Sequence, residues 1–118
     1  MLVRGALAWL ALPEFLIEEG TPRICNVLKV GIAVVPATEA RSAGIETGGL
    51  PKMPPGVCLP TITIEMEQNV AEGLFRLPLG LANWVLDAVA LTREFGKSPF
   101  PGRVEFRLHA GYYEALGL

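Results

Sequence analysis

The sequence predicts an α+β fold: a mainly antiparallel β-sandwich or small barrel, with one long helix at about residues 80–95 and a long Pro- and Gly-rich loop at about residues 36–60. Two segments alternate apolar and polar residues with the period of two that strands have. One longer apolar segment carries the end signals of a helix. Because the strands lack the alternating helices that a parallel βαβ sheet needs, we expect antiparallel pairing.

The length and composition predict one domain with an unusually apolar surface. A chain of 118 residues with 51% hydrophobic residues and a mean hydropathy of +0.41 cannot hide all of its apolar side chains in one small core. We therefore expect part of the surface to meet a partner, and self-association is the simplest form of that contact. A net charge of −2, without a clustered basic excess, argues against nucleic-acid recognition.

Residues 1–20 do not distinguish a strand from a helix, because the apolar run before Pro13 fits either. The stretch from Pro13 to Gly20 can form a short helix, with proline at its first position and glycine after its end. Arg4 and the apolar residues 6–12 imitate a signal peptide, but the run is short and no clear cleavage site follows. We expect a protein that is not secreted and has no membrane partner, since no apolar run is long enough to span a bilayer.

Residues 24–35 are apolar on both faces and predict a central or interface strand that bends at Gly31. Residues 68–73 suit a hairpin loop. Residues 74–78 then predict a short return strand that ends at Pro78.

Residues 61–67 and 103–109 predict half-buried strands, because apolar and polar side chains alternate along both. The outward face of the first strand is expected to carry Thr61, Thr63, Glu65 and Glu67. The outward face of the second is expected to carry Arg103, Glu105, Arg107 and His109. If the two strands are antiparallel neighbours, a glutamate of the first would meet an arginine of the second.

Residues 80–95 predict the one long helix. Its polar residues Asn83, Asp87 and Glu94 fall on a single narrow stripe, and Gly96 stands where a left-handed C-terminal cap is expected. The remaining apolar arc is wider than one sheet can cover. The helix therefore lies between two layers, or its second side meets another subunit, and Trp84 is expected in the core close to that interface.

No pattern of catalytic or metal-binding residues occurs in the sequence. His109, the only histidine, is on the polar face of a strand, where such residues are usually inert. Glu65 and Glu67 share one strand face, which solvent-side patterning explains better than glycoside chemistry or cation binding. Cys25 and Cys58 are expected to be core thiols, with a bridge only in an oxidising compartment. We expect no enzymatic activity, cofactor or metal.

The stretch GGLPKMPPGVCLP at residues 48–60 predicts a stiff arm or hairpin that leads into the following strand. Its prolines lower the cost of ordering it against a neighbour, so deleting residues 49–56 should impair assembly more than folding. The P-x-x-P spacing within it is more simply a stiff loop than a docking motif. The expected interface residues are Lys52, Met53, Pro54, Pro55, Trp84, Leu91 and Phe95.

Several short motifs follow one another between residues 30 and 110. They comprise Ser42, Gly44, Ile45 and Glu46, then Lys52, Met53, Pro54 and Gly56, then Ile62, Thr63 and Ile64, with Trp84 in the helix. In this order they resemble the tail tube proteins of contractile phage tails and related injection systems. The resemblance implies a small β-sandwich or barrel with one flanking helix, stacked rings in which a long loop reaches a neighbouring subunit, and a cytoplasmic or virion-associated protein.

Three classes of function remain open at this point. The first is a non-enzymatic structural protein that self-assembles, in the form of a tail tube or a related assembly. The second is a regulatory domain that binds a small molecule or peptide between sheet and helix. The third, held lowest, is an enzyme that uses Glu65, Glu67 or His109.

Overall fold

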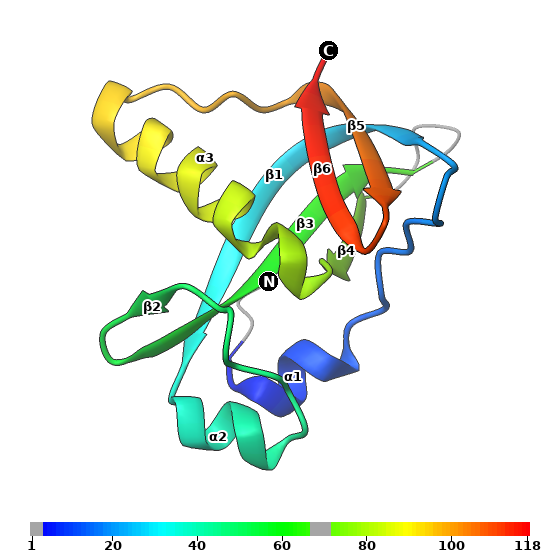
Figure 1. Cartoon of the computed structure of the whole chain (residues 1–118). Coiled ribbons are helices and arrows are strands. Elements are labelled where there is room, and N and C mark those ends of the chain that lie inside the picture. Colours follow the sequence, from blue (N-terminus) through cyan, green and yellow to red (C-terminus); the bar gives the residue numbers. More distant parts are fainter. Residues whose placement is uncertain (1–3, 67–71) are drawn as a thin grey trace.

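The computed structural model describes residues 4–66 and 72–118 (Figure 1). The strands are β1 (Arg23–Val35), β2 (Lys52–Met53), β3 (Gly56–Glu65), β4 (Glu72–Arg76), β5 (Gly102–His109) and β6 (Tyr112–Gly117). The helices are α1 (Ala6–Ala11), α2 (Ala37–Ser42), the 3-10 turn η2 (Leu79–Leu81) and α3 (Ala82–Phe95). The α+β class, the antiparallel pairing and the long helix are thereby confirmed.

The six strands form one bent sheet in the order β2-β3-β1-β5-β6, with β4 beside β3 on the same edge as β2. Every ladder is antiparallel. No ladder among the described residues joins β6 to β2 or β4, so the strand order itself does not close a barrel. β1 is the central strand, as its apolar character on both faces predicts.

Because β1 separates β3 from β5, these two strands are not neighbours, and the condition for an ion pair between them is not met. Glu65 instead accepts a hydrogen bond from the side-chain amide of Asn26 on β1. Arg107 pairs with Glu105, two residues away on its own strand. Glu67, the other glutamate of the expectation, lies outside the described residues.

The irregularity in β1 lies at Leu28, three residues before the expected bend at Gly31. Val27 pairs with Ile64, and Lys29 pairs with the adjacent residue Thr63, which leaves Leu28 as an extra residue in the ladder. Such a β-bulge moves the following side chains to the opposite face. Gly31 leaves room for a neighbouring side chain on β3, since a Cβ there would lie 3.0 Å from the hydroxyl oxygen of Thr61, which is closer than an ordinary contact.

β3 is buried on both faces, so the expectation of a half-buried strand was wrong. Thr61 and Thr63, expected to face solvent, are 8% and 4% exposed. One face of β3, with Ile62 and Ile64, contributes to the cluster that contains Val85 of α3. The opposite face contributes Val57 and Leu59 to a second cluster, and this cluster also contains Trp9 of α1 and Ala40 of α2.

The N-terminal segment forms α1 and then an extended stretch, so the short helix that the sequence allowed from Pro13 to Gly20 is not present. Phe15 and Ile17 are buried while Leu16 between them is exposed, which is the alternation of an extended chain. Single parallel bridges join this stretch to Arg76 of β4 and Leu108 of β5. The buried ring of Phe15 packs edge-on against Phe75 and Phe106.

The segment predicted as a continuous loop over residues 36–60 contains regular structure. It holds α2, the short strand β2 and the beginning of β3, which starts at Gly56. Leu50 within it is 7% exposed and belongs to the core cluster of α1 and α2. Deleting residues 49–56 would therefore remove a core side chain and would not separate assembly from folding.

Candidate interaction surfaces

The helix α3 presents its C-terminal half to solvent. Val85 and Ala88 face the sheet, whereas Leu91 is 48% and Phe95 67% exposed. Leu118, at the end of the chain after β6, is 68% exposed. Gly96 ends the helix in the left-handed conformation, and its N–H donates to the carbonyl oxygen of Thr92, as the cap prediction required.

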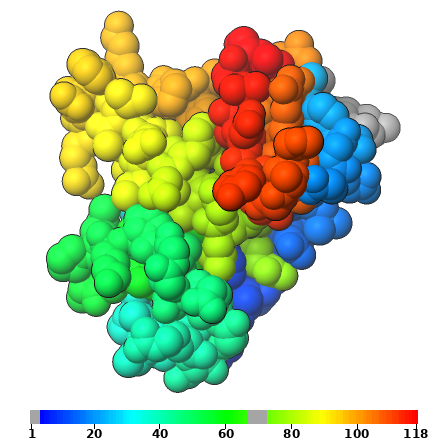
Figure 2. Space-filling model, viewed as in Figure 1, coloured from blue at the N-terminus to red at the C-terminus, as the bar shows by residue number. Residues whose placement is uncertain are grey.

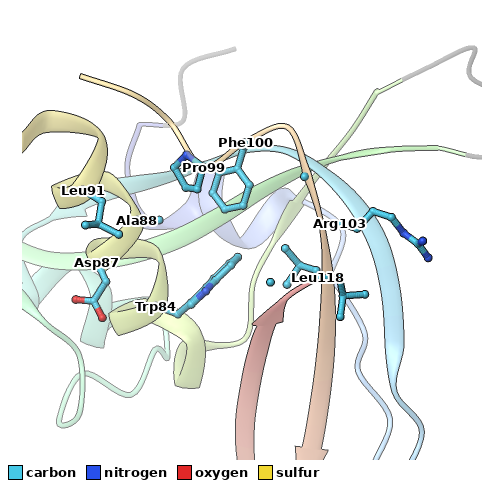
Figure 3. Close-up of a pocket in the computed structure, with 11 residues that line it drawn as sticks. Trp84, Asp87, Ala88, Leu91, Pro99, Phe100, Arg103 and Leu118 are labelled. Carbon is cyan, nitrogen blue, oxygen red and sulfur yellow. The ribbon is translucent and has the colours of Figure 1, made fainter. Parts of the chain in front are cut away.

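A pocket of about 270 Å³ lies between α3, the segment 99–104 and the end of β6 (Figure 3). Its walls are largely apolar and aromatic. The ring of Trp84 packs edge-on against Phe100, with 5.9 Å between ring centroids, and against Phe106 at 5.5 Å. Leu91 and Leu118 line the same pocket, so two of the exposed apolar side chains form part of its wall.

The pocket carries one carboxylate on its helix side. Asp87 is an exposed lining residue one turn before Leu91. Arg103 also lines the pocket, but its side chain points away from Trp84 and Leu118 in Figure 3. This orientation follows from strand alternation, because the next residue, Val104, faces the core. Asp87 and Arg103 are therefore the two charged side chains of the pocket lining, and both point away from Phe100 in Figure 3.

The second candidate surface is the β2–β3 hairpin. Lys52 pairs with Val57 and Met53 with Gly56, which places Pro54 and Pro55 alone in the turn. Lys52 and both prolines are exposed, while Met53 is half-buried. In Figure 1 this hairpin projects beyond the central strands, and in Figure 2 it (green) and the C-terminal half of α3 (yellow) stand apart at the same edge of the molecule.

The expected interface residues therefore lie on two surfaces. Trp84 and Leu91 meet at the pocket, with Phe95 one turn further along the helix. Lys52, Met53, Pro54 and Pro55 form the hairpin and do not line the pocket. Sequence reasoning missed Phe100 and Leu118. An aromatic residue between Pro99 and Pro101 was the available signal for the first, and no sequence pattern pointed to the second.

The residues considered for catalysis are dispersed. His109 is exposed at the end of β5, and the carboxylate of Glu65 accepts a hydrogen bond from Asn26.

Both cysteines are free. Burial raises the pKa of the Cys58 thiol, and burial also raises the pKa of Cys25, where the nearby Arg23 guanidinium partly offsets it. Over residues 4–66 and 72–118, no group of three His, Cys, Asp or Glu side chains could hold a metal ion.

In the part of the chain that the structure describes, no helix is long and apolar enough to cross a membrane. Comparisons with protein-family models, with curated proteins and with solved structures find no match to this chain.

Proposed function

We propose that this protein is a non-enzymatic structural subunit that assembles with copies of itself, in the form of a phage-type tail tube or a related ring. The observation that carries this proposal is the exposed apolar surface around the α3 pocket. Leu91, Phe95 and Leu118 are large side chains that a monomer leaves about half or more in water. Burying one such side chain fully contributes about 1.5–3 kcal/mol, so a second copy that covers the surface gains substantially.

Two further features support an open or ring-like assembly. The hairpin and the α3 pocket occupy different parts of the molecule, and contacts between unlike surfaces join subunits head to tail. Head-to-tail contacts form rings when the rotation closes and filaments when it does not. The resemblance of the motif order to tail tube proteins favours stacked rings among these forms.

The test is the oligomeric state of the full chain by size-exclusion chromatography with light scattering over a range of concentrations. We expect wild-type protein to assemble and Phe95→Glu to shift the population toward monomer, because a charge replaces an apolar contact. Leu7→Glu is the matched control, since Leu7 is an equally apolar and 75% exposed residue on α1. A wild-type monomer at the highest concentration, or equal effects of the two substitutions, would contradict the proposal.

The pocket favours a second candidate function, the binding of a small apolar ligand or peptide. Its aromatic floor at Trp84 and its volume of about 270 Å³ suit a ligand smaller than most drugs. A ligand that binds the folded state raises the Tm, and one beside Trp84 also changes its fluorescence. Thermal-shift screening of an apolar fragment library tests this function, and a library without any stabilising member counts against it.

A further inference from the structure

The central strand β1 has a free edge over its second half. β3 pairs with β1 as far as Val35, but β5 pairs only with residues 23–27, because β5 begins at Gly102 opposite Val27 (Figure 1). Within the described residues, no other strand pairs with β1 on the side that β5 leaves. Residues 29–35 therefore form a strand with one neighbour and one open side, which we call the free edge.

A hydrogen bond on the far side of β3 shows which backbone groups point to the free edge. The Leu77 N–H, just after β4, donates to the Pro60 carbonyl oxygen at 3.1 Å, so Pro60 directs its carbonyl away from β1. Pro60 stands opposite Ile32 in the β1–β3 ladder. Opposite residues of an antiparallel ladder exchange both of their backbone hydrogen bonds or neither. Ile32 therefore directs its N–H and C=O away from β3.

Val34 and Val30 follow the same pattern. Cys58, opposite Val34, donates its N–H to the Pro51 carbonyl oxygen on the β2 side at 3.0 Å. Val30 lies two residues before Ile32 in a regular part of the ladder, so alternation gives it the same direction. Over the described ranges, no backbone hydrogen bond from another segment reaches these three residues. Their N–H and C=O groups form a row along the free edge.

Such a row is a template for one more strand. Natural sheets protect free edges with prolines or charges, whereas residues 30–35 contain neither. Extended peptides add to an edge of this kind through main-chain hydrogen bonds, and pockets beside the edge select their side chains. The surface next to the free edge therefore indicates which segment it binds.

A pocket of about 430 Å³ lies at the start of the free edge, between β1, α3 and the segment 98–100. Val30, Val89 and Phe100 give it an apolar wall, and Thr92 and Ser98 bring hydroxyl groups. The Ser98 Oγ accepts a hydrogen bond from the Phe100 N–H at 3.1 Å, which leaves its own proton for an acceptor on a ligand. The pocket thus suits an apolar side chain with a hydrogen-bond acceptor beside it.

The charged residues of this pocket are cations. Lys29 and Arg93 line it and are exposed, and in the described part of the chain no Asp or Glu lines it and no ion pair involves either cation. A carboxylate complements these charges. A strand added antiparallel, the commoner pairing, runs from Val35 toward Lys29, so its C-terminal end reaches the pocket.

We propose that the free edge of β1 binds an extended segment of a partner protein as an added antiparallel strand, with a carboxylate at the C-terminal end of that segment beside Lys29 and Arg93. All the binding groups belong to one copy of the chain. The inference is therefore independent of the proposed self-assembly, and a wild-type monomer would refute self-assembly and leave this contact standing.

Hydrogen exchange of the full chain, followed by NMR, tests the mode of binding. The probe is an amidated peptide of about seven residues, the length of the free edge, that alternates threonine with valine and ends in glutamate. At saturation it should slow exchange of the Val30, Ile32 and Val34 amides about 10-fold or more, and leave the Gly31 and Ala33 amides, which point to β3, unchanged. Unchanged exchange of the outward amides, or no binding of the peptide, overturns the proposal. Protection that rises with protein concentration without peptide shows that a second copy fills the edge, and also overturns it.

A charge exchange tests the carboxylate. The same peptide with a terminal lysine in place of glutamate should bind about 10-fold more weakly in fluorescence anisotropy, and Lys29→Glu combined with Arg93→Glu should invert this order. Arg41→Glu, at an exposed cation of α2 outside the pocket lining, is the matched control and should keep it. Equal affinities of the two peptides for the wild type would contradict the proposal. A third peptide, with glutamine at its end and a free C-terminal carboxylate, shows whether a chain end or a side chain supplies the charge.

Val34→Pro tests the main-chain contact, because proline removes one outward N–H and leaves the ladder with β3 intact. It should weaken binding of the glutamate peptide about 10-fold, whereas Val34→Thr, which keeps the N–H, should bind like the wild type. Equal binding by a folded Val34→Pro variant would refute strand addition. If that variant does not fold, the exchange pattern of the wild type decides.

Discussion

Replacing Gly56 by alanine tests how the hairpin is held against the central strand. A Cβ at Gly56 would lie 1.9 Å from the carbonyl oxygen of Val35 and 2.4 Å from its carbonyl carbon, whereas ordinary contacts begin at 3.4 Å. The clash is with backbone of β1 that is paired to β3, so no side-chain rotation relieves it. Overpacking of this kind costs about 1–3 kcal/mol, and we expect the upper end of that range, about 3 kcal/mol.

The unfolding entropy of a protein grows with its length, and for 118 residues a loss of 1 kcal/mol in the free energy of unfolding lowers the Tm by about 4 °C. Gly56→Ala should therefore lower the Tm by roughly 12 °C. Urea denaturation followed by tryptophan fluorescence should show a lower midpoint with an unchanged slope. Gly49→Ala is the control in the same segment, because no atom lies within 4 Å of a Cβ there. Equal stability of the two variants, within about 0.5 kcal/mol, would refute the reasoning.

Three other predictions concern the core. Phe15→Ala should cost about 3–5 kcal/mol in urea denaturation, because the fully buried ring joins the N-terminal segment to β4 and β5. Trp9→Phe should cost more than about 1 kcal/mol in the same assay, since it removes the 2.9 Å hydrogen bond from the indole N–H to the Pro60 carbonyl oxygen and also leaves space in the core around a buried side chain. The free energy of unfolding should fall as pH rises above about 9, because burial raises the pKa of the Cys58 thiol from its ordinary 9.0 and the unfolded chain ionises first. Urea midpoints between pH 7 and 10 measure this decline, and Cys58→Ala should make it smaller.

The parts of the fold that sequence predicted are those in which one local signal decides the structure. The helix that ends at Gly96 has a cap, a period and a proline beyond its end, and all three agree. The strand 103–109 has polar residues on one face, and that face is the more exposed one in the fold. Alternation also led to the prediction for residues 61–67, but there it misled, because Thr61 and Thr63 are small enough to be buried beside other layers.

Long-range contacts decided the rest. The stretch from Pro13 to Gly20 has acceptable helix ends, but its backbone pairs with Arg76 and Leu108, which lie far away in sequence. The site shows the same division. Trp84 and Leu91 were predicted from the wide apolar arc of one helix, whereas Phe100 and Leu118 reach the pocket only because separate segments meet there.

The extra residue Leu28 makes β1 two half-strands with opposite phase. Without it, a strict alternation from Val27 would direct Val30 and Ile32 away from the cluster that contains Val27, and all three contact that cluster. The single strand β1 thereby packs against the cluster of helix α3 with its middle residues. At its end it packs against the α1–α2 layer, whose core cluster includes Ala33 and Val35. Deleting Leu28 would turn the side chains on one side of the bulge to the opposite faces of the sheet, so that residues of the α3 cluster would face the α1–α2 layer and the reverse. This position should therefore tolerate substitution far better than deletion.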